Sequence, residues 1–231
     1  MKLYAIPYAG GFAFTYYKWK KYLDAGIELC PIELPGRGTR AKEDLCTSIE
    51  AMAEHAYKQI NVSSEEYILF GHSMGAYVLL EVYKKLQANN RPLPQQVVLS
   101  AMKPPHLYIH KQHHLLDEGT FKEKMMDLGG LPEEVMQDQE FSAYILRLLR
   151  NDFKAVEEYQ KRIESVFSSD VHLLNSEADI SRNDIEEWNL YTSSSVQYHS
   201  FEGSHFFINE HPSDVVETIN QLANKQVQQV R

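Results

Sequence analysis

The sequence contains little cysteine: its only two cysteines are Cys30 and Cys46. They fall in different predicted elements and do not form a C-x-x-C pair. This arrangement argues against a disulfide framework and against a cysteine zinc site, and it favours a reducing compartment. We therefore expect a protein of the cytoplasm.

Long hydrophobic runs and a basic excess are also missing. No apolar run approaches the roughly 20 residues that span a bilayer, and the first residues hold no stretch long enough for a signal peptide. The 32 acidic and 23 basic residues give a net charge of −9, which argues against nucleic acid or an anionic membrane as the main partner. The 231 residues suit a single domain, 1–231.

No internal repeat, low-complexity segment or interdomain linker interrupts the chain. Instead, short apolar runs alternate with helical patterns, which is typical of a parallel sheet covered by helices on both faces. The expected strands cover residues 3–6, 27–34, 67–70, 97–101, 171–174 and 196–201. The expected helices cover residues 14–23, 47–60, 74–87, 184–191 and 212–223.

This alternation stops over residues 102–165, where the pattern contains loops and helices but no strand. Apolar residues over 141–149 follow helical spacing, as do those over 121–128, where Gly129-Gly130 marks a helix end. Pro132 predicts the first turn of a further helix. We expect residues 102–165 to form a helical insertion that lies over the strand ends as a lid. The alternative is a helical subdomain without a gating role.

The segment Gly71-His72-Ser73-Met74-Gly75 organises the chain, because a predicted strand precedes it and a predicted helix follows it. In that context G-x-S-x-G is a nucleophile elbow, in which a sharp turn raises the serine above the sheet edge. Glycine at positions 71 and 75 lets the strand and helix approach closely. The start of the helix also points free N–H groups at whatever the serine attacks. Ser73 is the candidate nucleophile.

A serine hydroxyl needs a base to remove its proton, and after an elbow the acid and then the histidine follow on loops behind later strands. Of ten histidines, only His205 lies in a glycine-containing loop directly after a predicted late strand. His72 lies inside the elbow and is expected to point away from the site. The adjacent pair His113-His114 lacks a second ligand pair at fixed spacing, so it does not predict a metal site. His205 is the candidate base.

The candidate acid is Asp179, which follows the predicted strand at 171–174 by a few residues and so lies at the same sheet end as the nucleophile. Asp170 precedes that strand and is expected at the opposite end. Asp184 is expected in the first turn of a helix. Glu177 is the alternative acid.

An oxyanion hole requires two N–H donors, usually one from the residue after the nucleophile and one from the loop after an early strand. Met74 supplies the first donor. The loop Pro7-Tyr8-Ala9-Gly10-Gly11 supplies the second, from Ala9 or alternatively from Tyr8.

Six motifs, in this order along nearly the whole chain, resemble those of the stand-alone type II thioesterases of nonribosomal peptide and polyketide synthesis. They are Pro7-Tyr8-Ala9-Gly10-Gly11, Glu33-Leu34-Pro35-Gly36-Arg37-Gly38, Gly71-His72-Ser73-Met74-Gly75, Leu99-Ser100-Ala101 with Pro104-Pro105, Leu128-Gly129-Gly130-Leu131-Pro132 and Leu149-Arg150-Asn151-Asp152. The resemblance implies an α/β-hydrolase fold with a helical lid. It also implies a catalytic triad of Ser73, Asp179 and His205.

The reaction that the resemblance implies is hydrolysis of acyl or aminoacyl groups misloaded on the phosphopantetheine arm of carrier proteins, which regenerates stalled synthetases. We expect no metal and no cofactor, and a monomer whose partner is a carrier protein domain. Carrier proteins are usually acidic and this chain is itself acidic, so docking should use a local basic or apolar patch. The candidates are Arg37, Arg40, Arg147, Arg150 and Lys154.

Two positions depart from the family pattern, because Ser176 and Ser204 stand where glycine is usual. A positive φ at either position would strain a serine. Two other enzymatic functions remain open on the same triad, a general carboxylesterase and a medium-chain acyl thioesterase. A non-catalytic binding protein is the third alternative, and it requires an incomplete or misplaced triad.

Overall fold

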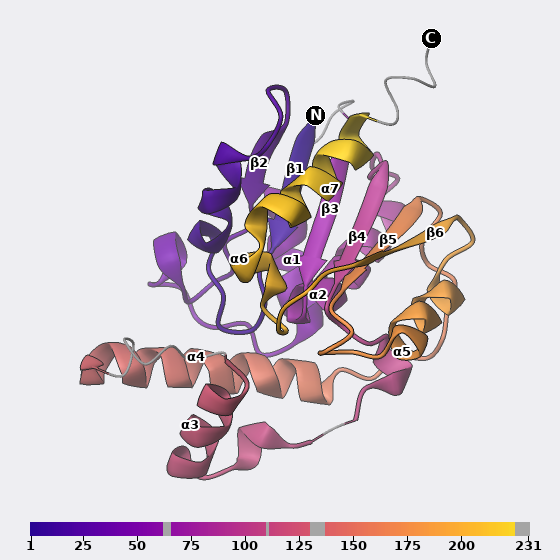
Figure 1. The fold of residues 1–231 in the computed structure, drawn as a ribbon. Coiled ribbons are helices and arrows are strands. Elements are labelled where there is room, and N and C mark those ends of the chain that lie inside the picture. Colours follow the sequence, from indigo (N-terminus) through magenta and orange to yellow (C-terminus); the bar gives the residue numbers. More distant parts are fainter. Residues whose placement is uncertain (62–65, 110, 130–136, 225–231) are drawn as a thin grey trace.

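The structure, a computed structural model, describes residues 1–61, 66–109, 111–129 and 137–224 (Figure 1). Its strands are β1 (Lys2–Ile6), β2 (Glu28–Pro31), β3 (Tyr67–His72), β4 (Gln96–Ser100), β5 (Asp170–Asn175) and β6 (Val196–Ser200). They form one six-stranded sheet in the order β2-β1-β3-β4-β5-β6, and every pairing is parallel. The expected fold class, a mostly parallel sheet flanked by helices, is confirmed.

The central strand β3 is buried along its whole length, because helices cover both faces of the sheet. Successive side chains of a strand point to opposite faces. Leu69 accordingly belongs to the hydrophobic cluster on one face, whereas Ile68 and Phe70 belong to the cluster on the other. Burial on both faces explains why this strand reads as a continuous apolar run in the sequence.

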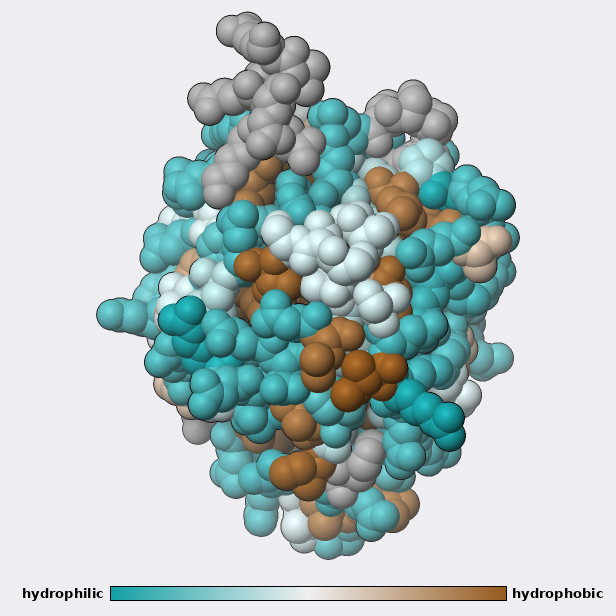
Figure 2. Space-filling model, turned by 90° about the vertical axis from the view of Figure 1, so that its right-hand side faces the viewer, coloured by the Kyte–Doolittle hydropathy of each residue, from teal (hydrophilic) through white to brown (hydrophobic). Residues whose placement is uncertain are grey.

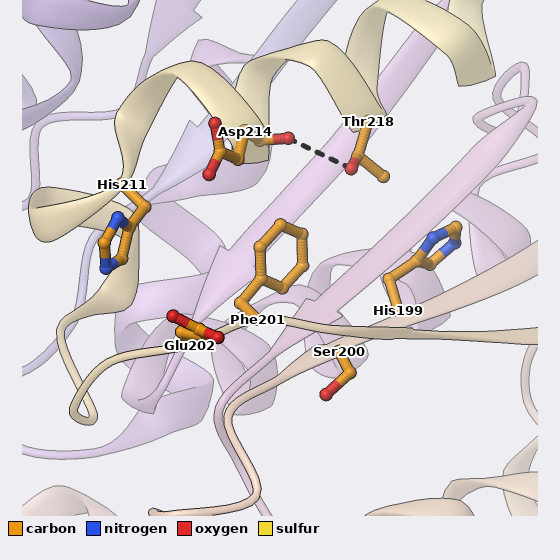
Figure 3. Close-up of a pocket in the computed structure, with 7 residues that line it drawn as sticks. All are labelled: His199, Ser200, Phe201, Glu202, His211, Asp214 and Thr218. Carbon is orange, nitrogen blue, oxygen red and sulfur yellow. Dashed lines mark hydrogen bonds between the residues drawn. The ribbon is translucent and has the colours of Figure 1, made fainter.

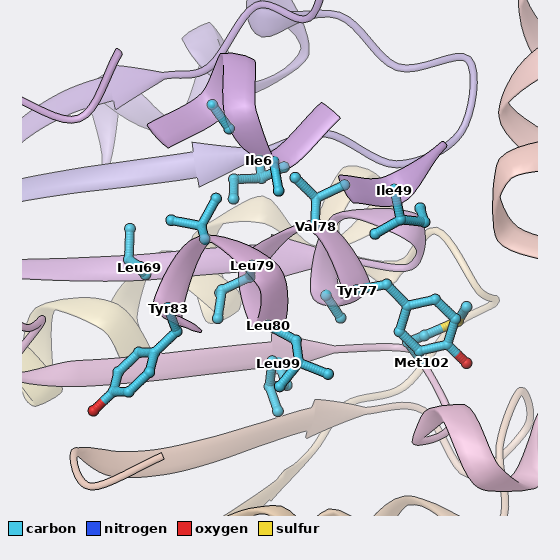
Figure 4. Close-up of a cluster of buried hydrophobic side chains, with 14 of the residues drawn as sticks. Ile6, Ile49, Leu69, Tyr77, Val78, Leu79, Leu80, Tyr83, Leu99 and Met102 are labelled. Carbon is cyan, nitrogen blue, oxygen red and sulfur yellow. The ribbon is translucent and has the colours of Figure 1, made fainter. Parts of the chain in front are cut away.

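Helices α1 (Ile49–Gln59) and α2 (Met74–Ala88) cover one face of the sheet. The side chain of Ser48 caps α1 by accepting a hydrogen bond from the N–H of Ala51. Helix α2 is apolar on most of its circumference, and Figure 4 shows its side chains packed against those of the strands. This packing holds the start of α2 against the end of β3.

The other face is covered by α6 (Phe207–Glu210), α7 (Pro212–Asn224) and a 3-10 helix over Ala13–Lys21 (Figure 1). A helix was expected at 14–23, but its geometry is that of a 3-10 helix. Its buried residues are Ala13, Tyr16 and Trp19, spaced three apart. A 3-10 helix has three residues per turn, so this spacing places all three on the sheet side.

Between β4 and β5 the described residues form helices and loops and no strand. Short 3-10 helices cover Pro105–Leu107 and His113–Leu115. The α-helices among these described residues are α3 (Glu118–Asp127) and α4 (Gln139–Glu158), which lie beyond one end of the sheet (Figure 1). Five side chains form a hydrophobic cluster between them: Phe121, Met125, Ile145, Leu146 and Leu149. The helix start expected at Pro132 lies outside the described residues.

After β5, the chain forms α5 (Arg182–Glu186) and a 3-10 turn over Glu187–Tyr191, where a single helix was expected. The strand expected at 27–34 is limited to Glu28–Pro31, and one further hydrogen bond, from the N–H of Ile32 to the carbonyl of Ala5 at 2.9 Å, follows it. The remaining predicted helices and strands occur within a few residues of their expected limits.

Figure 2 shows one side of the molecule as a mainly hydrophilic surface with small separate hydrophobic patches. None of the helices in the described ranges is both long enough and apolar enough to cross a membrane.

Phe70 tests the importance of the buried β3 strand. Its side chain is fully buried, and its ring centroid lies 5.0 Å from that of Trp19 and 5.8 Å from that of Tyr16. We expect Phe70→Ala to lower the free energy of unfolding by about 3–5 kcal/mol, since it opens a cavity in the core. Phe14→Ala is the matched control, because Phe14 is 59% exposed and its truncation should cost less than about 1 kcal/mol. Urea denaturation measures both, and equal losses would contradict the expectation.

Candidate active site

The turn between β3 and α2 holds Ser73 in a strained backbone conformation, with φ 53° and ψ −123°. Residues other than glycine rarely adopt positive φ, and such strain is concentrated at functional sites. A Cβ atom at Gly71 would collide with the backbone of Gly75, and one at Gly75 would collide with the carbonyl of Ile6. The two glycines therefore allow the close strand–helix contact that fixes the turn.

Asp179 and His205 lie together on neighbouring loops, after β5 and after β6. The Oδ2 atom of Asp179 is 2.6 Å from Nδ1 of His205. A carboxylate at Nδ1 holds the proton there and leaves Nε2 free to act as a base. Glu177, the alternative acid, is exposed and makes no hydrogen bond to His205 within the described residues.

Ser73, Asp179 and His205 line one cavity of about 320 Å³. The structure thus brings together three residues that are far apart in the sequence. The Ser73 hydroxyl makes no hydrogen bond to any described residue. Hydrogen bonds between a nucleophile and its base are often long before substrate binds.

The two other acids considered from the sequence lie elsewhere. Asp170 is the first residue of β5, and it accepts hydrogen bonds from the hydroxyls of Ser194 and Ser195 at the opposite end of the sheet. Asp184 lies in the first turn of α5 and forms an ion pair with Lys103 at 2.6 Å.

The two serines that depart from the family pattern stabilise the loops that carry Asp179 and His205. Neither Ser176 nor Ser204 has a positive φ, so neither is strained. The hydroxyl of Ser176 donates to the carbonyl of Gly203 at 2.6 Å, which ties the acid loop to the base loop. The N–H and the hydroxyl of Ser204 both donate to the carboxylate of Glu210.

His72 does not line the cavity, but it lies directly behind the candidate base. Its ring centroid is 5.2 Å from that of His205, and its Nδ1 is 2.9 Å from the hydroxyl of Ser100. Complete burial, and then the neighbouring charge of His205, lower the pKa of His72 well below its usual value. The neutral imidazole of His72 therefore packs against the ring of His205, a contact that the sequence analysis missed.

The loop over residues 7–11 leaves few amides free. The N–H of Gly10 donates to Oδ2 of Asp152 at 2.8 Å, and the N–H of Gly11 donates to the carbonyl of Tyr8 at 2.8 Å. In contrast, the N–H groups of Tyr8, Ala9 and Met74 make no hydrogen bond to the described part of the chain. All three of those residues line the cavity that contains Ser73.

Helices α3 and α4 form the apolar wall of the same cavity, opposite the strand ends. Met125 from α3 and Leu149, Phe153 and Val156 from α4 line it. The helical segment between β4 and β5 is therefore part of the site.

Arg37 was expected to belong to a basic docking surface, and this expectation is wrong. Its side chain is fully buried and forms an ion pair with Asp152. Of the other candidates, Arg40 pairs with Glu43, and Arg150 donates to the carbonyls of His114 and Leu116. Arg147 and Lys154, together with Arg150, line a hollow of about 740 Å³ along α4.

A second hollow lies between the end of β6 and α7 (Figure 3). Figure 3 shows His199 and His211 on opposite sides of Phe201. In the insertion, His113 and His114 both pair with the buried carboxylate of Glu157. Within the described ranges, no three His, Cys, Asp or Glu residues are close enough to hold a metal ion.

Known proteins resemble this chain in sequence and in structure. Residues 1–223 match the family model of the thioesterase domain. The gramicidin S biosynthesis protein GrsT of Aneurinibacillus migulanus is 30% identical over 224 residues, which cover 94% of this chain and 86% of that protein.

Among solved structures, ClbQ from the colibactin NRPS/PKS pathway superposes with a TM-score of 0.88 at 29% identity, and 97% of each chain is covered. YbtT, a type II thioesterase from the yersiniabactin NRPS/PKS pathway, superposes with a TM-score of 0.85 at 26% identity. That match covers 95% of this chain and 91% of YbtT. These structures have the α/β-hydrolase fold that the sequence predicts for this chain.

The buried neutral His72 predicts a pH-dependent stability. The folded state keeps His72 neutral, whereas an unfolded histidine takes up a proton below about pH 6.5. Stability is therefore present above that pH and falls as the pH decreases, by up to about 1.4 kcal/mol per pH unit for one group. Urea denaturation of wild type and His72→Gln at pH 7.5, 6.5 and 5.5 should show the smaller pH dependence in the variant. Equal dependence in both proteins would contradict this role.

Proposed function

The chain belongs to the thioesterase domain family, and we propose that it hydrolyses acyl and aminoacyl thioesters on the phosphopantetheine arm of carrier proteins, with Ser73, His205 and Asp179 as its catalytic groups. One observation supports this assignment of the catalytic groups most directly. The Asp179–His205 pair, joined at 2.6 Å, lines the same cavity as a serine on a strained strand–helix turn.

In the proposed mechanism, Oγ of Ser73 attacks the thioester carbonyl while Nε2 of His205 takes the hydroxyl proton. The carboxylate of Asp179 holds the Nδ1 proton and stabilises the imidazolium that forms. His205 then protonates the departing thiol, leaving an acyl group on Ser73. A water molecule activated by His205 attacks this ester and releases the carboxylic acid.

The negative charge on the carbonyl oxygen requires two N–H donors. We assign them to Met74 and Ala9, with Tyr8 as the alternative to Ala9. These three amides are free in the described structure, whereas those of Gly10 and Gly11 are used within the protein. The free amides thus support the same choice as the sequence.

These groups supply the nucleophile, the proton transfers and the charge stabilisation, so the proposed reaction needs no metal and no resident cofactor. The phosphopantetheine arm belongs to the substrate. The apolar wall formed by α3 and α4 fits an acyl group better than a charged one. We further propose that residues 102–165 act as a lid over this acyl group.

The biological role follows from the similar proteins. GrsT is named for gramicidin S biosynthesis, and ClbQ and YbtT are described as parts of NRPS/PKS pathways. We propose the same kind of role, an editing enzyme that clears misloaded carrier domains of a nonribosomal peptide or polyketide synthetase. It would act as a monomer in the cytoplasm, where its two free cysteines stay reduced.

The decisive test is the release of acetyl, aminoacyl and longer acyl groups from a loaded carrier protein, with a simple alkyl ester at matched concentration. We expect carrier thioesters to be cleaved faster than the ester. Ser73→Ala should reduce turnover by roughly 10⁴-fold or more, since it removes the nucleophile. Faster cleavage of the ester would favour a carboxylesterase, and a preference for long acyl groups would favour a medium-chain thioesterase. No cleavage of either substrate would favour a binding protein.

The assignment of the acid is tested by a pair of variants on one loop. Asp179→Asn should lower kcat by roughly 10³- to 10⁴-fold, because the amide cannot hold His205 in the active tautomer. Glu177→Gln is the matched control, and it should retain near-normal thioester turnover because Glu177, within the described residues, makes no hydrogen bond to His205. The reverse pattern would identify Glu177 as the acid.

A further inference from the structure

We propose that the buried ion pair between Arg37 and Asp152 is a positioning device for the loop that donates to the oxyanion. Through this pair, helix α4 sets the backbone of residues 7–11. The inference rests on the proposed function, because it concerns the geometry of the same reaction.

The ion pair is bidentate and completely buried. Nη1 of Arg37 lies 2.8 Å from Oδ2 of Asp152, and Nη2 lies 2.9 Å from Oδ1. Both side chains are 0% exposed. Two parallel hydrogen bonds between planar groups fix their relative orientation as well as their distance.

Both members of the pair also bind the oxyanion loop. Oδ2 of Asp152 accepts a hydrogen bond from the N–H of Gly10 at 2.8 Å. Nη1 of Arg37 donates to the carbonyl of Gly11 at 3.2 Å. The ion pair thus holds the loop at a donor and at an acceptor, immediately after Ala9.

Packing between the loop and α4 reinforces these hydrogen bonds. Gly10 has a φ of +74°, and a Cβ atom there would collide with the side chain of Leu149. Leu149 and Asp152 are three residues apart on α4, so they lie on one face of the helix. One side chain of that face packs on Gly10 while the other accepts its N–H.

This arrangement has a chemical consequence for the neighbouring residue. With its own amide bound to Asp152, Gly10 cannot turn its N–H toward the substrate. The N–H of Ala9 belongs to the preceding peptide plane, between Tyr8 and Ala9, and the carbonyl of that plane accepts a hydrogen bond from the N–H of Gly11 at 2.8 Å. By holding Gly10 and Gly11, the ion pair keeps this contact in place, and the N–H of Ala9 has no hydrogen-bond partner among the described residues. Oxyanion stabilisation depends on donors placed before the charge develops, which is what the ion pair provides.

Stability alone does not account for such a pair. Removing two charges from water is costly, and an apolar pair of similar volume is often as stable. The contacts of Arg37 and Asp152, however, go to the polar groups of the loop, which an apolar pair could not hold. We therefore expect their loss to change transition-state binding more than substrate binding.

The test compares Asp152→Asn with wild type in three measurements. On a carrier thioester, kcat should fall by about 10- to 100-fold while KM changes by less than about 3-fold, because a misplaced donor acts mainly in the transition state. An alkyl trifluoromethyl ketone, which forms a tetrahedral oxyanion adduct with the serine, should bind more weakly by the same factor. The carboxylic acid product should bind as before.

Tyr159→Phe is the matched control. The hydroxyl of Tyr159 donates to the carboxylate of Glu81 at 2.7 Å and anchors the end of α4 in the core, away from the loop. This variant loosens the same helix, but it should leave the affinity for the ketone unchanged. Should Asp152→Asn not fold, Arg37→Lys serves the same test, because lysine keeps the charge and cannot make both hydrogen bonds.

Two kinds of result would overturn the proposal. If Asp152→Asn binds the ketone as tightly as wild type does, or if Tyr159→Phe weakens binding equally, the ion pair has no specific effect on the loop. Wild-type turnover of the carrier thioester in the same experiment would show that the proposed function still holds. A wild type that neither cleaves the thioester nor binds the ketone would overturn both.

Discussion

The site depends on one constraint: all strands of the sheet run in the same direction, so the loops that follow them meet at one edge. The turn after β3 presents Ser73 there, and the loops after β5 and β6 present Asp179 and His205. The loop after β1 adds the amide of Ala9. Residues from distant parts of the chain reach one cavity because the C-terminal ends of parallel strands all lie at the same edge of the sheet.

The strained turn at Ser73 is maintained by the burial on both sides of it. Helix α2 is packed against one face of the sheet, and β3 is buried between the two hydrophobic clusters. A residue other than glycine at positive φ costs of order 1–3 kcal/mol, which only a well-packed surrounding can offset. The same surrounding keeps His72 neutral behind His205. Core packing and catalytic geometry are therefore linked at this turn.

Much of this arrangement could be predicted from the sequence, because it is local or follows from chain order. The strand, the elbow and α2 are adjacent in the sequence, and Asp179 and His205 stand directly after predicted strands. What could not be predicted depends on contacts between distant residues. Arg37 and Asp152 lie in two motifs that the sequence analysis quoted, yet nothing in either motif indicates that they meet across 115 positions. The burial of Arg37 was missed for that reason.

The close contact between Gly10 and Leu149 has a consequence for protein engineering. Exchanging the segment between β4 and β5 is one way to change the apolar wall of the cavity. In this chain, α4 cannot be exchanged alone. The replacement helix would need a side chain that packs against Gly10 as Leu149 does, and a carboxylate in the place of Asp152. Helix α3 contributes Met125 to the cavity wall, and its described residues make no hydrogen bond to the loop over residues 7–11. Its Phe121 and Met125 pack in one cluster with Leu149, however, so a redesign of α3 has to preserve that packing.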